Sequence, residues 1–170
     1  MTVDVPTIET ERLHLRPWHD DDLDGYADIC ADPEVMRHLG QGITLTRGDA
    51  WRQMAMFVGH WQLKGFGTWA VEEKATHRFV GRIGLHRPEG WPDLEVGWTL
   101  ARDVWKQGYA TEGGRASLDY AWNRLGATRV VSLILPENTA SIRVAQRLGQ
   151  TFERTWMLDG LEVHIYAIER

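Results

Sequence analysis

The segment with the clearest chemical potential runs from Trp105 to Glu112 and reads Trp-Lys-Gln-Gly-Tyr-Ala-Thr-Glu. Gly108 permits backbone torsions that a side chain would forbid, and Ala110 is small enough to let a ligand approach the backbone. Helical spacing begins here, so the segment predicts a turn that leads into a helix. The free amides and positive dipole at such a helix start favour an anion. Thr111 is expected to cap the helix or bond a phosphate, and Lys106 adds positive charge.

This turn differs from two common phosphate-binding motifs. It lacks the GxxxxGK[ST] pattern of a P-loop, and it lacks the second and third glycines of the dinucleotide motif GxGxxG. Physical chemistry alone therefore predicts a phosphate-bearing ligand. An ordinary strand-to-helix turn remains the alternative at this point.

The elements around the turn predict a mixed α/β domain. Alternating or continuous apolar residues predict strands, and apolar residues at helical spacing predict helices between them. Asp159-Gly160 is a strong signal for a final hairpin. The predicted strands cover residues 12–18, 66–72, 79–85, 94–100 and 130–135 and the two arms of that hairpin, and the helices start near residues 20, 32, 46, 108 and 138. No linker or repeat interrupts the pattern, so we expect one domain over residues 1–170.

Composition restricts the class of function. The 170 residues carry a net charge of −5 without a block of lysines or arginines, which argues against a nucleic-acid partner. The apolar runs are short and the N-terminus does not read as a signal peptide, so we expect a cytoplasmic protein with no membrane partner. The lone Cys30 is interpreted as a structural thiol and the run Asp20–Asp22 as a solvated capping feature, so no metal is expected.

The turn resembles the pyrophosphate loop of the GNAT superfamily of N-acetyltransferases, whose signature is [RQ]-x-x-G-x-[GA]. Gly108 and Ala110 match its last two fixed positions, whereas Trp105 stands where Arg or Gln is usual. The form W-x-x-G-Y-A-T-E is similar to the Rim-type ribosomal-protein N-terminal acetyltransferases. The segments 10–17, 32–36 and 138–144 resemble that branch in the same order, so the resemblance covers residues 10–168.

The resemblance implies a GNAT-like α/β (α+β) fold, with a mixed, mostly antiparallel sheet of about seven strands flanked by about four helices. A V-shaped opening would lie between strands 94–100 and 130–135. Acetyl-CoA would enter it, with the pantetheine arm along the first strand and the pyrophosphate on the turn. The cofactor-binding residues implied are Trp98, Thr99, Leu100, Trp105, Lys106, Gln107, Gly108, Tyr109, Ala110, Thr111, Asn138 and Ser141.

Acetyl transfer to an amine requires a neutral nucleophile, a stabilised oxyanion and a proton for the leaving thiolate. Glu95 would lie beside the thioester, so it is the first candidate for the base, directly or through a water. A structural or substrate-orienting role for this carboxylate is the alternative. The substitutes are His86, His164 and Tyr166.

The candidate acid is Ser141. Many members of the superfamily use a tyrosine seven residues after the asparagine of the last helix, but that position is Ala145 here. The Rim-type resemblance implies the Ser141 hydroxyl instead, although a serine in a first helical turn can also bond backbone amides.

The predicted function is transfer of the acetyl group of acetyl-CoA to a primary amine by direct attack in a ternary complex. The acceptor is either a protein N-terminal α-amino group or a small-molecule amine. We expect its pocket between the helices of Ala31–Lys64 and the final hairpin, with Trp51 and Trp61 as an aromatic surface. A non-catalytic module that binds CoA thioesters and a general nucleotide-binding domain are the alternatives, and a homodimer is an open expectation because the family includes many dimers.

Overall fold

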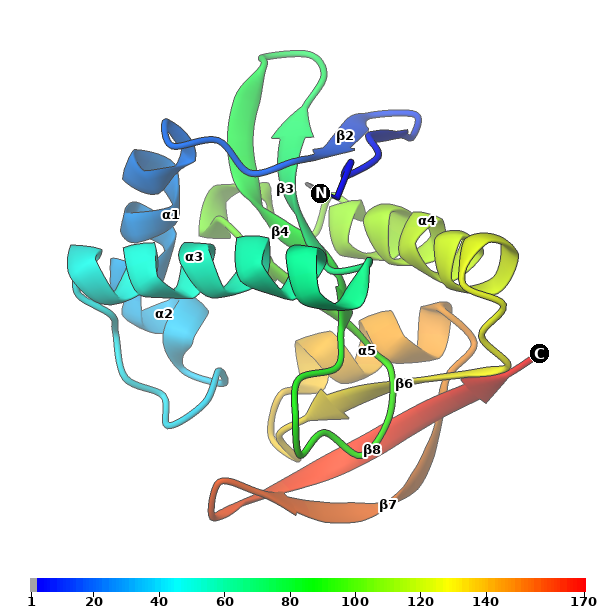
Figure 1. Ribbon diagram of the computed structural model, residues 1–170. Coiled ribbons are helices and arrows are strands. Elements are labelled where there is room, and N and C mark those ends of the chain that lie inside the picture. Colours follow the sequence, from blue (N-terminus) through cyan, green and yellow to red (C-terminus); the bar gives the residue numbers. More distant parts are fainter. Residues whose placement is uncertain (1–2) are drawn as a thin grey trace.

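The sheet of the computed structural model, which describes residues 3–170, follows the order β1-β2-β3-β4-β5-β6-β8-β7 (Figure 1). All neighbouring strands are antiparallel except the pair β5 and β6. The strands are β1 (Ile8–Glu9), β2 (Leu13–Arg16), β3 (Thr68–Glu73), β4 (Arg78–His86), β5 (Glu95–Leu100), β6 (Arg129–Ile134), β7 (Thr151–Leu158) and β8 (Leu161–Glu169).

Helices cover both faces of this sheet (Figure 1). Gly25 and Phe79 are in close contact where α1 meets β4, and Gly113 approaches Ile83 where α4 covers the other face of the same strand. The helices are α1 (Asp22–Ala31), α2 (Pro33–Met36), α3 (Arg47–Lys64), α4 (Tyr109–Arg124) and α5 (Thr139–Arg147), with a short 3-10 helix η1 (Arg102–Val104) before α4.

The predicted fold class, mixed α/β with a mostly antiparallel sheet, is confirmed. Residues 3–170 contain eight strands and five α-helices, whereas the resemblance implies about seven and about four; the five helices begin near the five positions that the sequence pattern predicts. The additional strand, β1, has only two residues, which is too short for alternation to be visible in the sequence. The shortest helix, α2, is a single turn of four residues that Asp32 caps and Pro33 begins.

The acidic run at the start of α1 is only partly as interpreted. Asp20 and Asp21 are exposed, as expected, and Asp21 occupies the N-cap without a side-chain hydrogen bond. Asp22 is only 4% exposed, because its carboxylate accepts two hydrogen bonds from Arg16 at 2.8 and 2.9 Å. Asp22 therefore anchors α1 to β2. Cys30 is buried, as expected.

The parallel pairing between β5 and β6 is very short. It contains one residue pair, Glu95 with Val131. Past this pair, side chains replace the backbone bonds: Ser132 Oγ donates to Val96 O at 2.7 Å, and the Leu133 amide donates to Glu95 Oε1 at 3.4 Å. The two strands therefore diverge beyond Glu95, at the place where the V-shaped opening is predicted.

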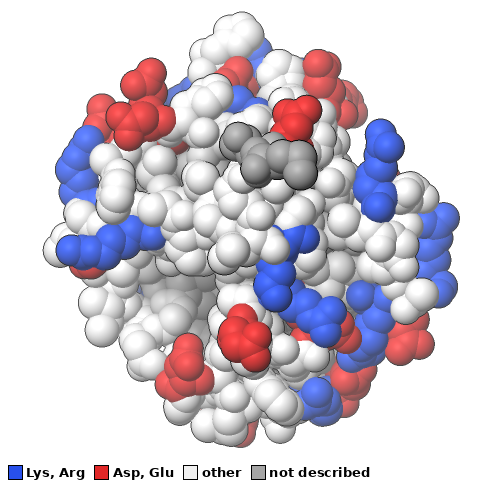
Figure 2. Space-filling model, in the orientation of Figure 1, with Lys and Arg blue, Asp and Glu red and all other residues white. Residues whose placement is uncertain are grey.

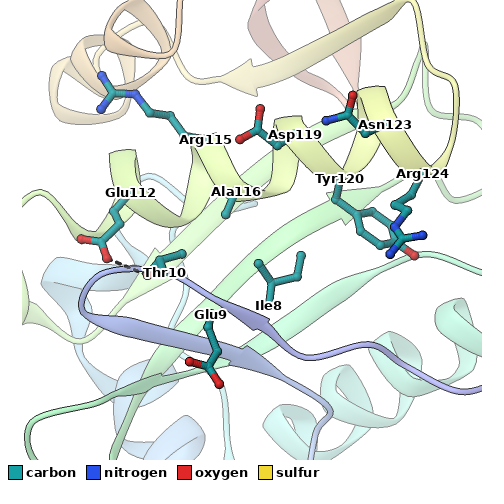
Figure 3. A pocket seen from close by; sticks show the side chains of 10 residues that line it. All are labelled: Ile8, Glu9, Thr10, Glu112, Arg115, Ala116, Asp119, Tyr120, Asn123 and Arg124. Carbon is teal, nitrogen blue, oxygen red and sulfur yellow. Dashed lines mark hydrogen bonds between the residues drawn. The ribbon is translucent and has the colours of Figure 1, made fainter.

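The carboxylate of Glu112 joins the N-terminal segment to the start of α4. It accepts hydrogen bonds from Thr10 Oγ1 at 2.6 Å (Figure 3), from the Arg12 amide at 2.7 Å and from Arg12 Nε at 2.7 Å. Arg12 Nη1 also donates to Gln107 O at 2.8 Å. Burial opposes ionisation of Glu112, but these donors outweigh it and lower its pKa. We call these contacts the Glu112 clamp.

The clamp predicts a pH-dependent contribution to stability. Glu112→Gln leaves the partners of a largely buried carboxylate poorly satisfied, so urea unfolding at pH 7 should show a loss of about 1–3 kcal/mol. The folded-state pKa is depressed, so this contribution is fully present above the unfolded pKa of about 4.3 and is lost as pH falls through the folded pKa. Wild type and variant should therefore converge in acid. Glu34→Gln, which removes an exposed ion pair with Arg37, is the control and should change little; equal stability of Glu112→Gln and wild type at pH 7 would contradict the role of the clamp.

Candidate active site

All residues that the sequence predicts as cofactor-binding line one cleft of about 990 Å³. Its walls come from the end of β5, the turn before α4, and the start of α5. The structure adds a further wall from α2 and the loop that follows it, with Val35, Arg37, His38 and Leu39. Segment 32–36 is part of the resemblance, but nothing in the sequence indicates that it and the following loop line the cofactor cleft.

The start of α4 presents backbone donors to the cleft. Its first backbone hydrogen bond runs from the Glu112 amide to Gly108 O, so the amides of Tyr109, Ala110 and Thr111 have no acceptor within the helix. Gly108 adopts a left-handed conformation, with φ of 85°, to make this start. The expected cap by Thr111 is wrong, because no side chain caps the helix and the Thr111 hydroxyl is buried without a partner. The backbone amides fit an anion, and the expectation that the Thr111 hydroxyl bonds a phosphate stays a prediction.

The opposite wall is fixed by two side chains. Asn138 Oδ1 caps α5 by accepting from the Ser141 amide at 3.2 Å. Ser141 Oγ accepts from Trp98 Nε1 at 3.2 Å, which connects β5 with α5 across the opening. The indole uses only a lone pair of this hydroxyl, so the hydroxyl proton remains free to be donated elsewhere.

Backbone alternation decides which part of β5 faces the opening. The carbonyls of Leu94 and Val96 both point toward β6. The backbone groups of Trp98, two residues after Val96, therefore point into the widening gap between β5 and β6. The backbone groups of Thr99 point toward β4. Thr99 presents its side chain instead, and its hydroxyl is buried without a partner.

Glu95 lies where β5 and β6 separate. Its Oε2 accepts from Trp91 Nε1 at 2.6 Å and its Oε1 accepts from the Leu133 amide. Burial raises the pKa of Glu95 to about 6, although these two donors partly oppose the shift. A carboxylate with this pKa is largely ionised at neutral pH and is a stronger proton acceptor than an exposed glutamate.

The other candidates for the base are less well placed or less basic. His86 pairs with Glu95 across the strands, but burial and then the charges of His60 and Arg82 lower its pKa to about 3. His164 and Tyr166 pair with β6 residues that alternate with Val131, so they project from the opposite face of the sheet to Glu95. The structure brings Glu95 and His86 together but not the other two.

The expected acceptor region is only partly as predicted. Trp61 is 1% exposed and packs edge-on against Trp69, so it belongs to the core and not to an aromatic surface, whereas Trp51 is exposed. The loop before α3 reaches the final hairpin, where Gln41 Nε2 donates to Asp159 O at 3.4 Å. Figure 2 shows the surface hollowed between α3 and this hairpin, with acidic and basic side chains interspersed over the visible face.

Residues 3–170 offer neither a cluster of metal ligands nor a membrane-spanning helix. Within that range, no group of three or more His, Cys, Asp or Glu side chains could hold a metal ion. No helix of the same range is both long and apolar enough to cross a membrane.

A splayed sheet with free helix-start amides at one end and a carboxylate of raised pKa at the other fits an acyltransferase whose acyl carrier lies between the strands. A family model described as "Acetyltransferase (GNAT) domain" matches residues 12–151. The chain therefore belongs to the GNAT acetyltransferase family. The prediction of an acetyl-CoA-dependent acetyltransferase is confirmed at this level.

Relatives and solved structures agree with this assignment. The protein YkkB of Bacillus subtilis is 34% identical over 155 residues, which cover 87% of each chain. The crystal structure of an acetyltransferase from Agrobacterium tumefaciens has a TM-score of 0.88 at 29% identity and covers 98% of this chain and 96% of its own. RimL, described as a ribosomal L7/L12 α-N-protein acetyltransferase in complex with coenzyme A, has a TM-score of 0.80 at 17% identity, covering 96% and 98%, and shows the shared fold.

The contact between Trp91 and Glu95 makes a measurable prediction. Trp91→Phe removes a donor that favours the ionised carboxylate, so the pKa of Glu95 should rise further above its ordinary value. Carbon-13 NMR titration of the glutamate side chains, with Glu95→Gln for assignment, measures this. Trp105→Phe is the control because its indole donates to Leu100 O and not to Glu95; an unchanged titration of Glu95 in Trp91→Phe would show that the contact does not act on its ionisation.

Proposed function

We propose that this protein acetylates a primary amine by direct attack on acetyl-CoA in the opening between β5 and β6. One observation carries the proposal: the anion-binding start of α4 and the carboxylate of Glu95 lie along the same strand-to-helix segment. Acetyl-CoA supplies the activated acetyl group as its thioester. The acceptor is a protein N-terminus or a small-molecule amine. The proposal includes a homodimer as the oligomeric state to be tested.

The cofactor residues divide by the chemistry they offer. The amides from Lys106 to Thr111 bind the pyrophosphate, and Trp98 offers unpaired backbone groups to the pantetheine arm. Thr99 and Leu100 continue this wall, while Asn138 and Ser141 form the other. The cleft fits such a ligand because Gly108 leaves the helix start uncovered by a side chain.

Two side chains are proposed to move the protons. Glu95 accepts a proton from the incoming ammonium, directly or through a water, so that the amine attacks in its neutral form. Ser141, whose oxygen lone pair is held by Trp98, donates its hydroxyl proton to the departing sulfur and regains a proton, through water, from the nitrogen that has attacked the carbonyl. Backbone amides of β5 that face the opening stabilise the charge that develops on the carbonyl oxygen.

The role of Glu95 predicts a change in the pH profile. In the wild type, kcat/KM should rise with pH through the pKa of Glu95, about 6, because only the ionised carboxylate accepts a proton. Glu95→Gln should lower kcat/KM about 100-fold at pH 7 and remove this limb. The deficit should shrink at high pH, where amines lose their proton unaided. Thiol release from acetyl-CoA with an amine panel measures kcat/KM and its pH profile. Asp28→Asn on the exposed side of α1 is the control. An unaltered pH profile in Glu95→Gln would exclude Glu95 as the base.

The cofactor turn predicts a conformational requirement at residue 108. A Cβ there would meet only Arg12 Nη2, at 3.4 Å, so space is sufficient, but a side chain at φ of 85° costs about 1–2 kcal/mol. Gly108→Ala should relieve this strain by tilting the α4 amides and should weaken CoA binding about tenfold in calorimetry. Gly160→Ala has the same strain at φ of 81° in an open hairpin turn and should leave CoA affinity unchanged. Wild-type affinity in Gly108→Ala would contradict the proposed pyrophosphate site.

A further inference from the structure

Arg82 of β4 has no directly paired acidic side chain among the described residues, although its charge partly offsets the rise in the pKa of Glu95. Its Nε donates to Tyr26 Oη at 3.2 Å, and its guanidinium lies 4.9 Å above the centre of the Phe57 ring. Across residues 3–170, no acidic side chain lies within ion-pair distance of it, although the side chain is half-buried. Removing a cation from water without a counter-ion is costly, so this arrangement favours an anion supplied from outside the chain.

The register between β4 and β5 places Arg82 on the same face as the candidate base. Arg82 pairs with Thr99 and His86 pairs with Glu95, with Gly84 and Gly97 paired between them. Residues two apart along a strand share a face, so these three pairs form one surface about 13 Å long. The two glycines in its middle contribute no side chains to the floor between Arg82 and Glu95.

The floor carries no side chain at Gly84 because neighbouring backbone packs closely against it. A Cβ at this residue would lie 2.7 Å from Gly67 O and 2.7 Å from Thr68 Cα, so only glycine fits there. Beside this floor, aromatic rings form a continuous wall. Phe57 packs edge-on to His86 with 6.2 Å between the ring centroids, and His86 packs edge-on to Trp91 with 5.3 Å between theirs. This wall leads from the guanidinium of Arg82 to the indole that holds Glu95.

A second polar group lies opposite Arg82 without a partner. Thr99 is 5% exposed, and its Oγ1 makes no hydrogen bond within the chain. A hydroxyl and a guanidinium are both donors, and the planar guanidinium matches the geometry of a carboxylate or phosphate. Arg82 is not needed to satisfy Glu95, whose oxygens already accept from Trp91 and Leu133.

We propose that Arg82, with Thr99, binds a carboxylate or phosphate on the acceptor and so directs its amino group toward Glu95. The preferred acceptor is therefore a primary amine that also carries an oxyanion. This inference rests on the proposed function and specifies its substrate class. Arg82 is a specificity-determining residue here and takes no part in proton transfer.

Matched pairs of acceptors test the proposal. The pairs are β-alanine and 4-aminobutyrate against their carboxamides, and O-phosphoethanolamine against ethanolamine, each assayed with acetyl-CoA by thiol release. The wild type should prefer the anionic member by about 10- to 100-fold in kcat/KM, as expected for a charge-assisted contact. Comparison of the carboxylate and phosphate pairs identifies which oxyanion is bound.

Variants separate specificity from structure. Assayed well above the pKa of Glu95, where that carboxyl is ionised with or without the charge of Arg82, Arg82→Gln should lose the 10- to 100-fold preference and retain its kcat/KM for the neutral amines. Arg78→Gln removes an equal charge at the other end of β4, where it pairs with Asp103 at 2.6 Å, and should keep the preference. CoA affinity of each variant, measured by calorimetry, reports that the fold is intact.

Three results would overturn the inference. Equal wild-type activity toward both members of each pair would reject the anion site while leaving the acetyltransferase function intact. An equal loss for anionic and neutral amines in Arg82→Gln would assign Arg82 to structure. If CoA binds but no amine is acetylated, the proposed function fails instead, and calorimetric binding of the same pairs to the CoA complex tests Arg82 directly: equal affinities of 4-aminobutyrate and its carboxamide would reject the site.

Discussion

The site depends on the parallel ladder between β5 and β6 ending after one residue pair. Had the ladder continued, backbone bonds would have closed the space in which a ligand can lie between the strands. Glu95 helps to end it, because its carboxylate accepts the Leu133 amide in place of a main-chain carbonyl. Ser132 similarly uses its hydroxyl to reach Val96 O. The Glu95 side chain thus helps to separate the two strands, and it places a carboxylate of raised pKa where they separate.

The Glu112 clamp gives the other end of the opening its rigidity. The α4 start must keep several amides without helix partners, which is a costly arrangement unless neighbouring contacts hold it in place. Arg12 provides such a contact by binding both Glu112 and the carbonyl of Gln107, on the two sides of Gly108. Tyr109 continues the same set, with its ring beneath Arg12 and its hydroxyl on Glu73. Residues from the first strands therefore support a turn about 100 positions later.

Local signals made the central part of the site predictable from the sequence. A glycine in a left-handed turn and a small residue one place further on describe a helix start without knowledge of the fold, so Gly108 and Ala110 were identified. Contacts between distant segments left no such signal: the burial of Trp61 against Trp69 and the guanidinium of Arg82 over Phe57 require the packing of α3 on the sheet. Periodicity identified α3 as amphipathic but could not determine which of its aromatic residues face the core.

The charges of the α4 start, Arg82 and Glu95 complement those of the proposed ligands. The chain is acidic overall, with a net charge of −5, yet it presents positive charge at the α4 start and at Arg82. Glu95 lies at the other end of the face that it shares with Arg82, and its burial raises the pKa of its carboxyl. An acceptor that carries an ammonium and an oxyanion would pair with Glu95 and Arg82 at once, so neither buried charge would stay uncompensated on binding. Transfer of the ammonium proton to Glu95 then neutralises that pair and leaves the oxyanion held, which keeps the free amine in position to attack.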